Sequence, residues 1–449
     1  MISPALGIVA DDDTGGTDVA GMLRERGWRP LLVFDLPDVG RLARWSEGYD
    51  AVVMCVGTRS VEPELARERT RTAIERLRGV GCGDFYVKYC STFDSTERGN
   101  IGPSLDAALD ALGEPLTIVV PALPVNGRTT YMGYHFVGRQ LLSDSPMRDH
   151  PLNPMRNPNL VDHLSRQTRR AVGLVDHPTV RGGAARVAAE LERLRARGVA
   201  MAVVDCIDDG DLAAIVAGNA RAGLRLVSGG SGLAMRMRPP RPAGEASSAS
   251  AGGAARGADS RAGVLVIAGS CSQATRTQNQ RFIDAGSGAT ALSAAEIRAG
   301  GEAAARAVSE AIAALGAGRD YLIAASAPPE VVAGIQREAA REGLTAEELG
   351  ARIGHGLAEI ARAILRAQSV AGLLIAGGET SGSLCRELGF GALAVGENIA
   401  PGVPLCFARE GFELPLVLKS GNFGGPDFYA QAGAAIRAAA AGHEAPPLL

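Results

Sequence analysis

Short apolar runs alternate with segments of helical spacing along most of the chain. In the first part, apolar runs predict strands over residues 5–10, 30–34, 51–57, 85–89 and 116–121, with helices predicted over 17–26, 63–78 and 102–112. The alternation resumes after residue 159 and continues to residue 227. A second series has strands predicted over 264–268, 321–325, 372–376, 405–408 and 415–418 and a last helix over about 427–441. Strands that alternate with helices are typical of parallel α/β sheets.

Two stretches interrupt this alternation. Residues 239–262 are almost wholly Pro, Ala, Gly, Ser and Arg, which cannot build a core, so we expect a flexible linker there. The predicted fold is therefore two α/β domains with largely parallel sheets, residues 1–238 and 263–449, and we expect the active site in the interdomain cleft. Residues 121–159 show no periodicity, and we expect a long functional loop.

Composition excludes several classes of partner. Forty-six basic residues face 49 acidic ones, for a net charge of -3, so we expect neither a nucleic acid nor a membrane as partner. The first apolar run is broken by Asp11 before it could serve as a signal or a span, so we expect a cytoplasmic protein. Seven scattered cysteines without a CxxC pair argue against a disulfide framework or a zinc site. The Ala-rich helices are compatible with a homodimer.

The first predicted strand ends in the sequence ADDDTGGTD. Asp11, Asp12 and Asp13 follow the strand directly, and a helical pattern begins after them. Ligands of open α/β sheets bind beyond the carboxyl ends of strands, so chemistry is expected here. Three adjacent carboxylates repel one another unless a cation, a substrate hydroxyl or backbone N–H groups bind to them. The alternative is a helix cap with two solvated acids.

Polar side chains also follow other strands of the first domain. Residues 90–102, CSTFDSTERGNIG, carry Ser91 and Asp94 with Lys88 behind them, which suits a small polyhydroxylated acid. Arg59 and Arg128 are candidates for a bidentate carboxylate clamp, although each taken singly also suits a turn cap or a surface position. The histidines at 135, 150 and 163 fit no metal-ligand spacing, and we expect them to be solvated or hydrogen-bonded.

The second domain has three Gly-rich turns after predicted strands. They are GSCS (269–272), GGETS (377–381) and KSGNFGG (419–425). Backbone N–H groups at such turns bind phosphate, so together they predict a nucleotide with several phosphates. The candidate contacts are Ser270, Ser272, Gly377, Gly378, Glu379, Thr380, Ser381, Lys419, Gly421 and Asn422.

Two other nucleotide motifs are absent. The chain has only two lysines, Lys88 and Lys419, and neither lies in GxxxxGK[ST], so a Walker-type phosphate loop is excluded. Residues 229–234, GGSGLA, match a dinucleotide fingerprint only in part, because the last Gly and the following acid are missing. A nicotinamide-dependent oxidoreductase is therefore disfavoured.

The motifs resemble those of the four-carbon acid sugar kinase family in the family's order and across nearly the whole chain. They are ADDDTGGTD, KYCSTFDSTERGNIGP, NGRTTYMG, HPLNPM, GSCSQAT, GGETSG, the Pro-Gly of residues 401–402 and LKSGNFGG. STFDST and HPLNPM are most similar to the 3-oxo-tetronate kinase branch. Asp13 and Gly16 depart from the usual first motif, where the family commonly has an apolar or aromatic residue and Ala.

The resemblance implies ATP-dependent phosphorylation of the terminal C4 hydroxyl of a four-carbon sugar acid, with ATP and Mg²⁺ as cofactors. It places the sugar acid on the amino-terminal domain and ATP on the carboxyl-terminal one, with nucleotide contacts at Ser270, residues 378–381 and Gly421. D-Threonate kinase, D-erythronate kinase and a non-catalytic nucleotide sensor are the alternatives.

Phosphoryl transfer needs positioning, charge neutralisation and a proton acceptor. We hypothesise that Asp12 deprotonates the C4 hydroxyl, with Asp11 assisting it or contacting Mg²⁺. The acid sugar would be held by Asp13, Arg59, Lys88, Ser91, Asp94 and Arg128. Lys419 or Mg²⁺ would offset the charge that develops on the phosphates.

Overall fold

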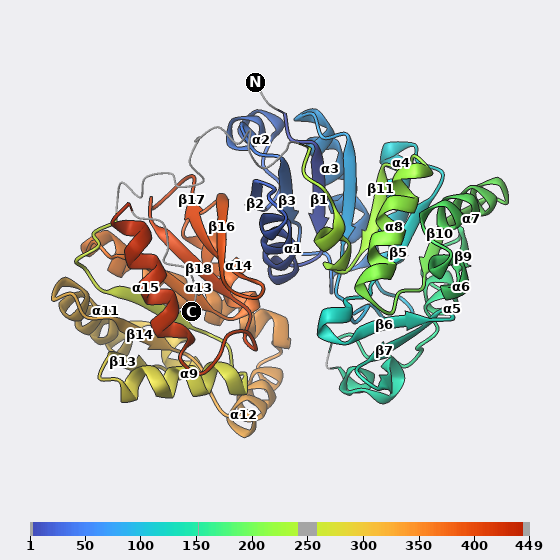
Figure 1. Ribbon diagram of the computed structural model, residues 1–449. Helices are drawn as coiled ribbons and strands as arrows, with labels where there is room; N and C mark the ends of the chain where they lie inside the picture. Colours follow the sequence, from blue (N-terminus) through green and yellow to red (C-terminus); the bar gives the residue numbers. More distant parts are fainter. Residues whose placement is uncertain (1–2, 151, 241–257, 443–449) are drawn as a thin grey trace. The chain divides into compact units, whose positions relative to one another are not determined.

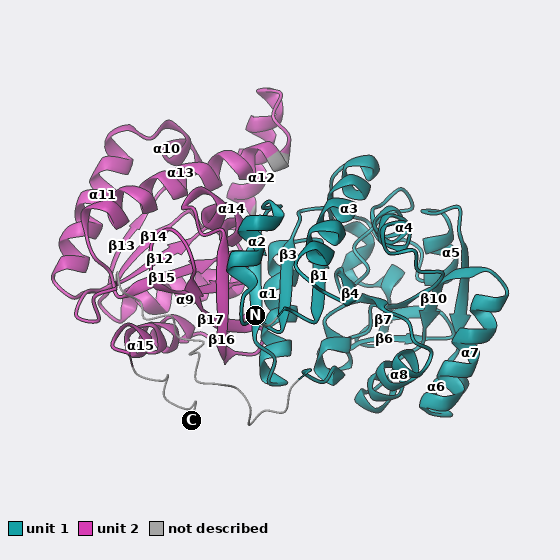
Figure 2. Ribbon diagram, turned by 90° about the horizontal axis from the view of Figure 1, so that it is seen from above, with its two compact units in different colours: residues 1–246 teal, residues 247–449 magenta. Residues whose placement is uncertain are grey.

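The computed structural model describes residues 3–150, 152–240 and 258–442 (Figure 1). The chain divides into two compact units, residues 1–246 and 247–449 (Figure 2). Most of the predicted linker, residues 241–257, lies outside the described residues. Each unit is an α/β sandwich around a largely parallel sheet, so the predicted fold class is confirmed.

The first unit is built on a parallel sheet with the order β2-β3-β1-β4-β11-β5-β10-β9. Its strands are β1 (Leu6–Ala10), β2 (Pro30–Phe34), β3 (Ala51–Cys55), β4 (Asp84–Lys88), β5 (Thr117–Val120), β9 (Ala171–Val175), β10 (Val199–Val204) and β11 (Leu226–Gly229). β1 is buried throughout and pairs with β3 and β4, so that Ala10 aligns with Cys55 and Lys88. The residues after these three strands therefore share one edge of the sheet.

Helices cover both faces of this sheet (Figure 2). One layer holds α2 (Val39–Ser46), α3 (Pro63–Gly79), α4 (Ile101–Leu112) and α5 (Leu160–Ser165). The other holds α1 (Asp13–Glu25), α6 (His177–Arg181), α7 (Ala184–Ala196), α8 (Asp209–Arg221) and the short 3₁₀ helix η4 (Gly232–Arg236). α1 begins four residues earlier than predicted, because the Asp12 carboxylate caps it and accepts a 2.7 Å hydrogen bond from the Gly15 N–H.

The expectation of an irregular loop over residues 121–159 is wrong. The segment holds a three-stranded antiparallel sheet of β6 (Arg128–Tyr131), β7 (Tyr134–Val137) and β8 (Gln140–Leu141). Met132 and Gly133 join the first two strands with φ values of 51° and 78°, as in the tightest hairpin turns. The strands are at most four residues long, and Tyr131 and Tyr134 are exposed, so little apolar alternation exists to predict them.

The second unit has the strand order β13-β14-β12-β15-β18-β17-β16. β12 (Val264–Ala268), β13 (Gly288–Ala291), β14 (Tyr321–Ala324), β15 (Gly372–Ala376) and β18 (Pro415–Lys419) are parallel, whereas β16 (Ala392–Ala400) and β17 (Val403–Ala408) are antiparallel. β13 has the sequence GATA, which lacks an apolar run, and neither it nor β16 is predicted from the pattern.

Helices again form two layers. α9 (Gln273–Asp284) and α15 (Phe428–Ala440) pack together on one face. α10 (Ala294–Ala299), α11 (Gly301–Gly316), α12 (Pro329–Arg341) and α14 (Gly378–Glu387) surround α13 (Ala346–Ala367) on the other. The strand order places β12, β15 and β18 side by side, so the three Gly-rich turns that follow them are neighbours.

Replacing Gly16 with Ala should destabilise the first unit. A Cβ at Gly16 would lie 2.3 Å from the Cys55 sulfur, well inside van der Waals contact. Overpacking of this kind costs about 1–3 kcal/mol, which outweighs the better helix propensity of Ala, about 1 kcal/mol. Denaturant unfolding of the two proteins measures the difference.

The double variant Gly16→Ala/Cys55→Ala is the control. Removing the sulfur makes room for the new methyl group, so adding Gly16→Ala to Cys55→Ala should cost less than adding it to the wild type. Equal costs in the two backgrounds would contradict the packing argument.

Candidate active site

The backbone joins the ends of β1, β3 and β4. The Asp11 N–H donates to the Lys88 carbonyl over 3.0 Å, and the Asp11 carbonyl accepts from the N–H groups of Thr58 and Arg59 over 2.8 and 3.2 Å. Asp11 is therefore held from both sides at the middle of the sheet edge. The ends of β1, β3 and β4 therefore lie together.

The Arg59 guanidinium contacts the carboxylates of two of the three adjacent aspartates. Its Nε and Nη2 donate to the two carboxylate oxygens of Asp11, each over 2.8 Å, and Nη1 lies 2.7 Å from Oδ2 of Asp12. The other oxygen of Asp12 caps α1. Burial raises the pKa of Asp11, and the Arg59 charge opposes this shift. Because the guanidinium fork is engaged by the two aspartates, Arg59 positions these acids instead of presenting a free clamp.

Asn100 fixes the segment that carries Arg59. Its side-chain amide donates to the carbonyls of Thr58 and Val61 over 2.7 and 2.6 Å. Asn100 stands at the start of α4, so the amide ties the end of β3 to the start of α4. Nothing in the sequence indicated that the partners of Asn100 flank Arg59.

Lys88 is the second cation of this edge. It is only 3% exposed, and its Nζ donates to the Tyr89 carbonyl over 2.9 Å. A Cβ at Gly15 would lie 2.7 Å from this nitrogen, so the first turn of α1 can approach Lys88 only with glycine at this position.

Sequence reasoning missed Asp18 and Ser231. The Ser231 hydroxyl donates to the Asp18 carboxylate, which connects α1 with the turn after β11. Burial raises the pKa of Asp18, whereas the nearby Lys88 charge and the Ser231 hydrogen bond lower it. The signal was the GGSGLA stretch, which was considered only as a dinucleotide fingerprint.

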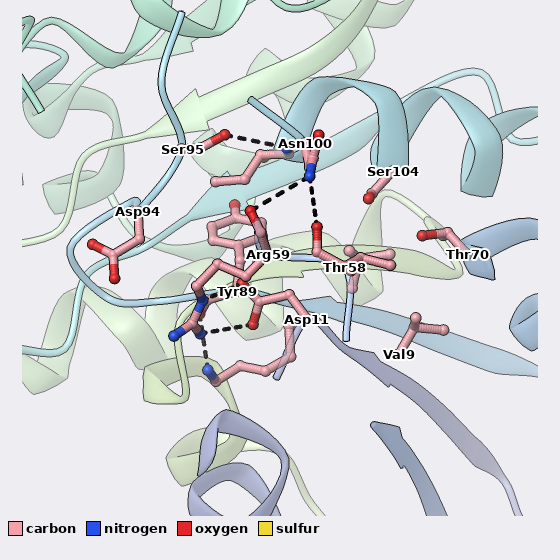
Figure 3. A pocket seen from close by; sticks show the side chains of 13 residues that line it. Val9, Asp11, Thr58, Arg59, Thr70, Tyr89, Asp94, Ser95, Asn100 and Ser104 are labelled. Carbon is pink, nitrogen blue, oxygen red and sulfur yellow. Dashed lines mark hydrogen bonds and ion pairs between the residues drawn. The ribbon is translucent and has the colours of Figure 1, made fainter. Parts of the chain in front are cut away.

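The structure brings four of the predicted site residues into one pocket, shown in Figure 3. Asp11, Arg59, Lys88 and Asp94 line it together with Thr58 and Asn100. Asp12 adjoins this group through its ion pair with Arg59. The pocket thus combines two cations with several carboxylates at the carboxyl end of the sheet.

Besides Asp12, three predicted residues are not among those lining the pocket. Asp13 is the first residue of α1, and its carbonyl accepts from the Thr17 hydroxyl over 2.9 Å. The Ser91 carbonyl accepts from a ring nitrogen of His135 over 2.8 Å. Arg128 lies on β6 and donates to the Asn126 carbonyl.

The prediction that the histidines are hydrogen-bonded is confirmed. His135 bonds Thr130 and Ser91, His163 bonds the Ser95 carbonyl over 2.6 Å, and His150 accepts from the Asn153 N–H over 3.1 Å. Burial lowers the pKa of His135 to about 4 and also lowers that of His163.

In the second unit the three Gly-rich turns contact one another. The Ser272 hydroxyl donates to the Gly421 carbonyl over 2.7 Å, and the Gly377 N–H donates to the Lys419 carbonyl over 2.8 Å. The Ser270 N–H donates to the Ala376 carbonyl over 3.1 Å, which joins the first turn to the second. The three turns that the sequence analysis grouped together are therefore joined to one another by hydrogen bonds.

Glycine is required where these turns approach most closely. A Cβ at Gly421 would lie 2.3 Å from the Ser270 hydroxyl oxygen. Gly377 has a φ of 139° and packs against Thr380, so a side chain there would be strained as well as crowded.

The remaining nucleotide candidates lie around this surface. Gly378 is the first residue of α14, which has no side-chain cap. The Ser381 hydroxyl points back to the Ile375 carbonyl over 3.5 Å, and Asn422 is exposed at the tip of the third turn. The side chain of Glu379 lies outside the described part of the structure.

Lys419 is fully buried beneath the turns. Its Nζ donates to the Ser420 and Gly421 carbonyls, each over 2.9 Å, and to the Thr275 hydroxyl over 3.2 Å. No carboxylate of the described residues forms an ion pair with it, and burial lowers its pKa to about 8. An ammonium group without a counter-ion, below three turns rich in backbone N–H groups, favours an anionic ligand.

Two searches of the described residues were negative. They contain no group of three or more His, Cys, Asp or Glu side chains that could hold a metal ion. Within the same residues, no helix has the length and apolar character needed to cross a membrane.

Two family models match most of the chain. The one described as a sugar-binding N-terminal domain matches residues 6–237, and the one described as a nucleotide-binding C-terminal domain matches residues 265–429. Together with the fold, they define a two-domain α/β protein with one domain of each type.

Relatives of nearly the same length indicate which kind of two-domain protein this is. A 3-oxo-tetronate kinase of Cupriavidus necator is 41% identical over 431 residues and covers 96% of each chain. One of Methylobacterium radiotolerans is 42% identical over 432 residues, which are 96% of this chain and 99% of its own. The chain belongs to the four-carbon acid sugar kinase family and is a kinase, so the resemblance of the motifs is confirmed.

Two solved structures share the fold of this chain. A protein of Haemophilus influenzae superposes with a TM-score of 0.75 at 35% identity, over 95% of this chain and 98% of its own. One of Salmonella typhimurium LT2 gives a TM-score of 0.77 at 34% identity over the same shares.

Replacing Arg59 with Gln should destabilise the first unit most at neutral pH. Two adjacent carboxylates lose their cation, which costs about 3 kcal/mol for a largely buried pair. Burial already raises the pKa of Asp11, and loss of Arg59 raises it further. The native state then binds a proton more readily than the unfolded chain, so the deficit shrinks as the pH falls from about 7 to about 5. Denaturant unfolding at both pH values tests this.

Arg166 is the matched control. It forms ion pairs of 2.7 and 2.9 Å with Glu97 and Asp162, but its side chain is 49% exposed. Arg166→Gln should therefore cost less than about 1 kcal/mol. Equal losses in the two variants would contradict the argument from burial.

Proposed function

We propose that the protein is an ATP-dependent kinase that phosphorylates the C4 hydroxyl of 3-oxo-tetronate. The observation that carries the nucleotide part is the joined surface of three glycine turns above Lys419, a buried cation with no described carboxylate partner. Backbone N–H groups and an uncompensated positive charge suit a polyphosphate. The choice of acceptor rests on the similarity to 3-oxo-tetronate kinases.

The acceptor would bind at the carboxyl edge of β1 and β4. Arg59 is engaged by Asp11 and Asp12, so Lys88 becomes the cation that faces the sugar carboxylate, with Asp94 directed at its hydroxyl groups. This changes the role that the sequence suggested for Arg59 from binding the acid to positioning the two aspartates. Arg128, Ser91 and Asp13 have weaker support, because none of them lines the pocket.

Phosphoryl transfer from ATP places two further demands on the protein. Donor and acceptor must be brought together, and we propose that they are in a cleft between the two domains. The developing charge must also be stabilised, which Mg²⁺ bound to the nucleotide phosphates does in such reactions. The described residues offer no preformed cluster for this ion, and we assign it no protein ligand.

A panel of acceptors tests this function. ADP release and mass spectrometry of the product should be measured with 3-oxo-tetronate, D-threonate and D-erythronate, each with ATP and Mg²⁺. We expect phosphorylation of 3-oxo-tetronate with the highest kcat/KM. If D-threonate or D-erythronate has the highest kcat/KM, that acid is the substrate instead. ATP binding without turnover of any acid would favour a nucleotide sensor.

ATP affinity should fall as the pH rises through about 8. Burial lowers the pKa of Lys419 to about 8, so the ammonium that attracts the phosphates is present below this pH and lost above it. Calorimetric titration with ATP between about pH 7 and about pH 9 measures the change.

Lys419→Met is the control for this measurement. The variant has no charge to lose, so it should bind ATP weakly and without the same dependence on pH. Parallel pH profiles for the two proteins would show that another group titrates.

A further inference from the structure

We propose that Asp94, and not Asp12, accepts the proton from the acceptor hydroxyl. This inference rests on the proposed kinase function and adds a catalytic role to a residue that the sequence suggested only for substrate binding. It follows from which carboxylate oxygens are engaged, from the place of Asp94 in the pocket, and from the loop that holds it.

Every carboxylate oxygen of Asp11 and Asp12 already has a partner in the protein. Both oxygens of Asp11 accept from the Arg59 guanidinium, while Asp12 uses one oxygen for Arg59 and the other for the Gly15 N–H. A substrate hydroxyl would therefore have to share an oxygen with a protein donor in either group.

Asp94 differs in this respect. Its Oδ1 accepts from the Thr92 hydroxyl over 2.8 Å, and its Oδ2 forms no hydrogen bond or ion pair with a described residue. Asp94 is 8% exposed and lines the same pocket as Asp11, Arg59 and Lys88. In Figure 3 no dashed line joins the Asp94 carboxylate to Arg59 or to Asp11. An accessible oxygen in a largely buried group is the geometry that a general base requires.

The loop around Asp94 is held in an unusual conformation. Phe93 has a φ of 54°, which bulky residues rarely adopt, although it is fully buried. Its ring makes edge contacts with Tyr89 and His163, at centroid distances of 5.5 and 5.9 Å. Such backbone conformations persist only where surrounding contacts enforce them, and they are common at active sites.

Two buried histidines enforce this conformation from the ends of the loop. His135 bonds the Ser91 carbonyl over 2.8 Å, and His163 bonds the Ser95 carbonyl over 2.6 Å. The Gln167 amide adds a 3.0 Å bond to the Ser95 hydroxyl. The loop is therefore fixed on both sides of Asp94, as preorganisation of a reactive group demands.

The proposed step balances as follows. The C4 oxygen of the acceptor forms a bond to the γ-phosphorus of ATP while its proton passes to Oδ2 of Asp94. The bond from the γ-phosphorus to the bridging oxygen breaks, and ADP leaves with the electron pair. Asp94 then releases the proton to water.

Asp94→Asn and Asp12→Asn should be compared with Glu97→Gln as the matched control. Glu97 lies three residues from Asp94, but its side chain is 53% exposed and pairs with the exposed Arg166. We expect kcat to fall by about 10²–10⁴-fold in Asp94→Asn, the range for a lost general base. Asp12→Asn should lose less, and Glu97→Gln should match the wild type. The dissociation constants for ATP and for the sugar acid, with thermal unfolding, show whether each variant is folded.

A second pair of variants separates chemistry from structure. In Asp94→Ala, added formate should restore part of kcat, because a small carboxylate can enter the space and accept the proton. In Asp12→Ala it should not. A merely structural role for Asp94 would not produce this rescue.

The outcomes distinguish two failures. If the wild type phosphorylates none of the three acids, the proposed function fails and this inference fails with it. If the wild type is active and Asp94→Asn keeps its kcat, or formate rescues only Asp12→Ala, the role of Asp94 alone is overturned.

Discussion

The contact of Arg59 with Asp11 and Asp12 is the constraint on which the acceptor side of the molecule depends. Two carboxylates that follow each other at the end of a buried strand repel, and one guanidinium offsets this repulsion through three contacts of 2.7–2.8 Å. Arg59 is fixed in turn by the backbone of Asp11 and by the Asn100 amide on its neighbours. The ends of β1 and β3 and the start of α4 are therefore one rigid unit. This rigidity leaves Lys88 and Asp94 as the charged groups of the pocket that can respond to a ligand.

The second unit has a buried cation where the first has a pair of adjacent carboxylates. Lys419 is a buried cation whose described partners are carbonyls and a hydroxyl, so its charge is solvated but not neutralised. A charge in this condition lowers the stability of the free protein and strengthens the binding of an anion. The glycines at 377 and 421 allow the backbone to surround the same place. In the first unit Arg59 is paired with two carboxylates of the protein, whereas the described partners of Lys419 in the second are carbonyls and a hydroxyl.

Much of the fold could be predicted because apolar runs mark the buried parallel strands. β2, β12 and β15 have the bounds that the pattern gave, and the acids and glycines after the strands fall on the sheet edges as expected. β13 and β16 were missed, and so was the small sheet of β6, β7 and β8, because short or half-exposed strands carry little periodicity. The predicted site residues also differ in how well the structure supports them. A sequence shows which residues follow a strand, but not which of their oxygens already accept hydrogen bonds. The contacts of Arg59 with Asp11 and Asp12 depend on side-chain geometry between segments about 48 residues apart.

The segment without periodicity explains how the loop at Asp94 keeps its shape. His135 of this segment bonds the Ser91 carbonyl of the loop, and His163, which lies just beyond the segment on α5, bonds the Ser95 carbonyl. Burial lowers the pKa of His135 to about 4, so the imidazole stays neutral where an unperturbed histidine would titrate, near pH 6.5. A neutral ring keeps the same donor and acceptor pattern toward Thr130 and Ser91 near neutral pH. His135 therefore serves as a fixed support for the loop that carries Asp94.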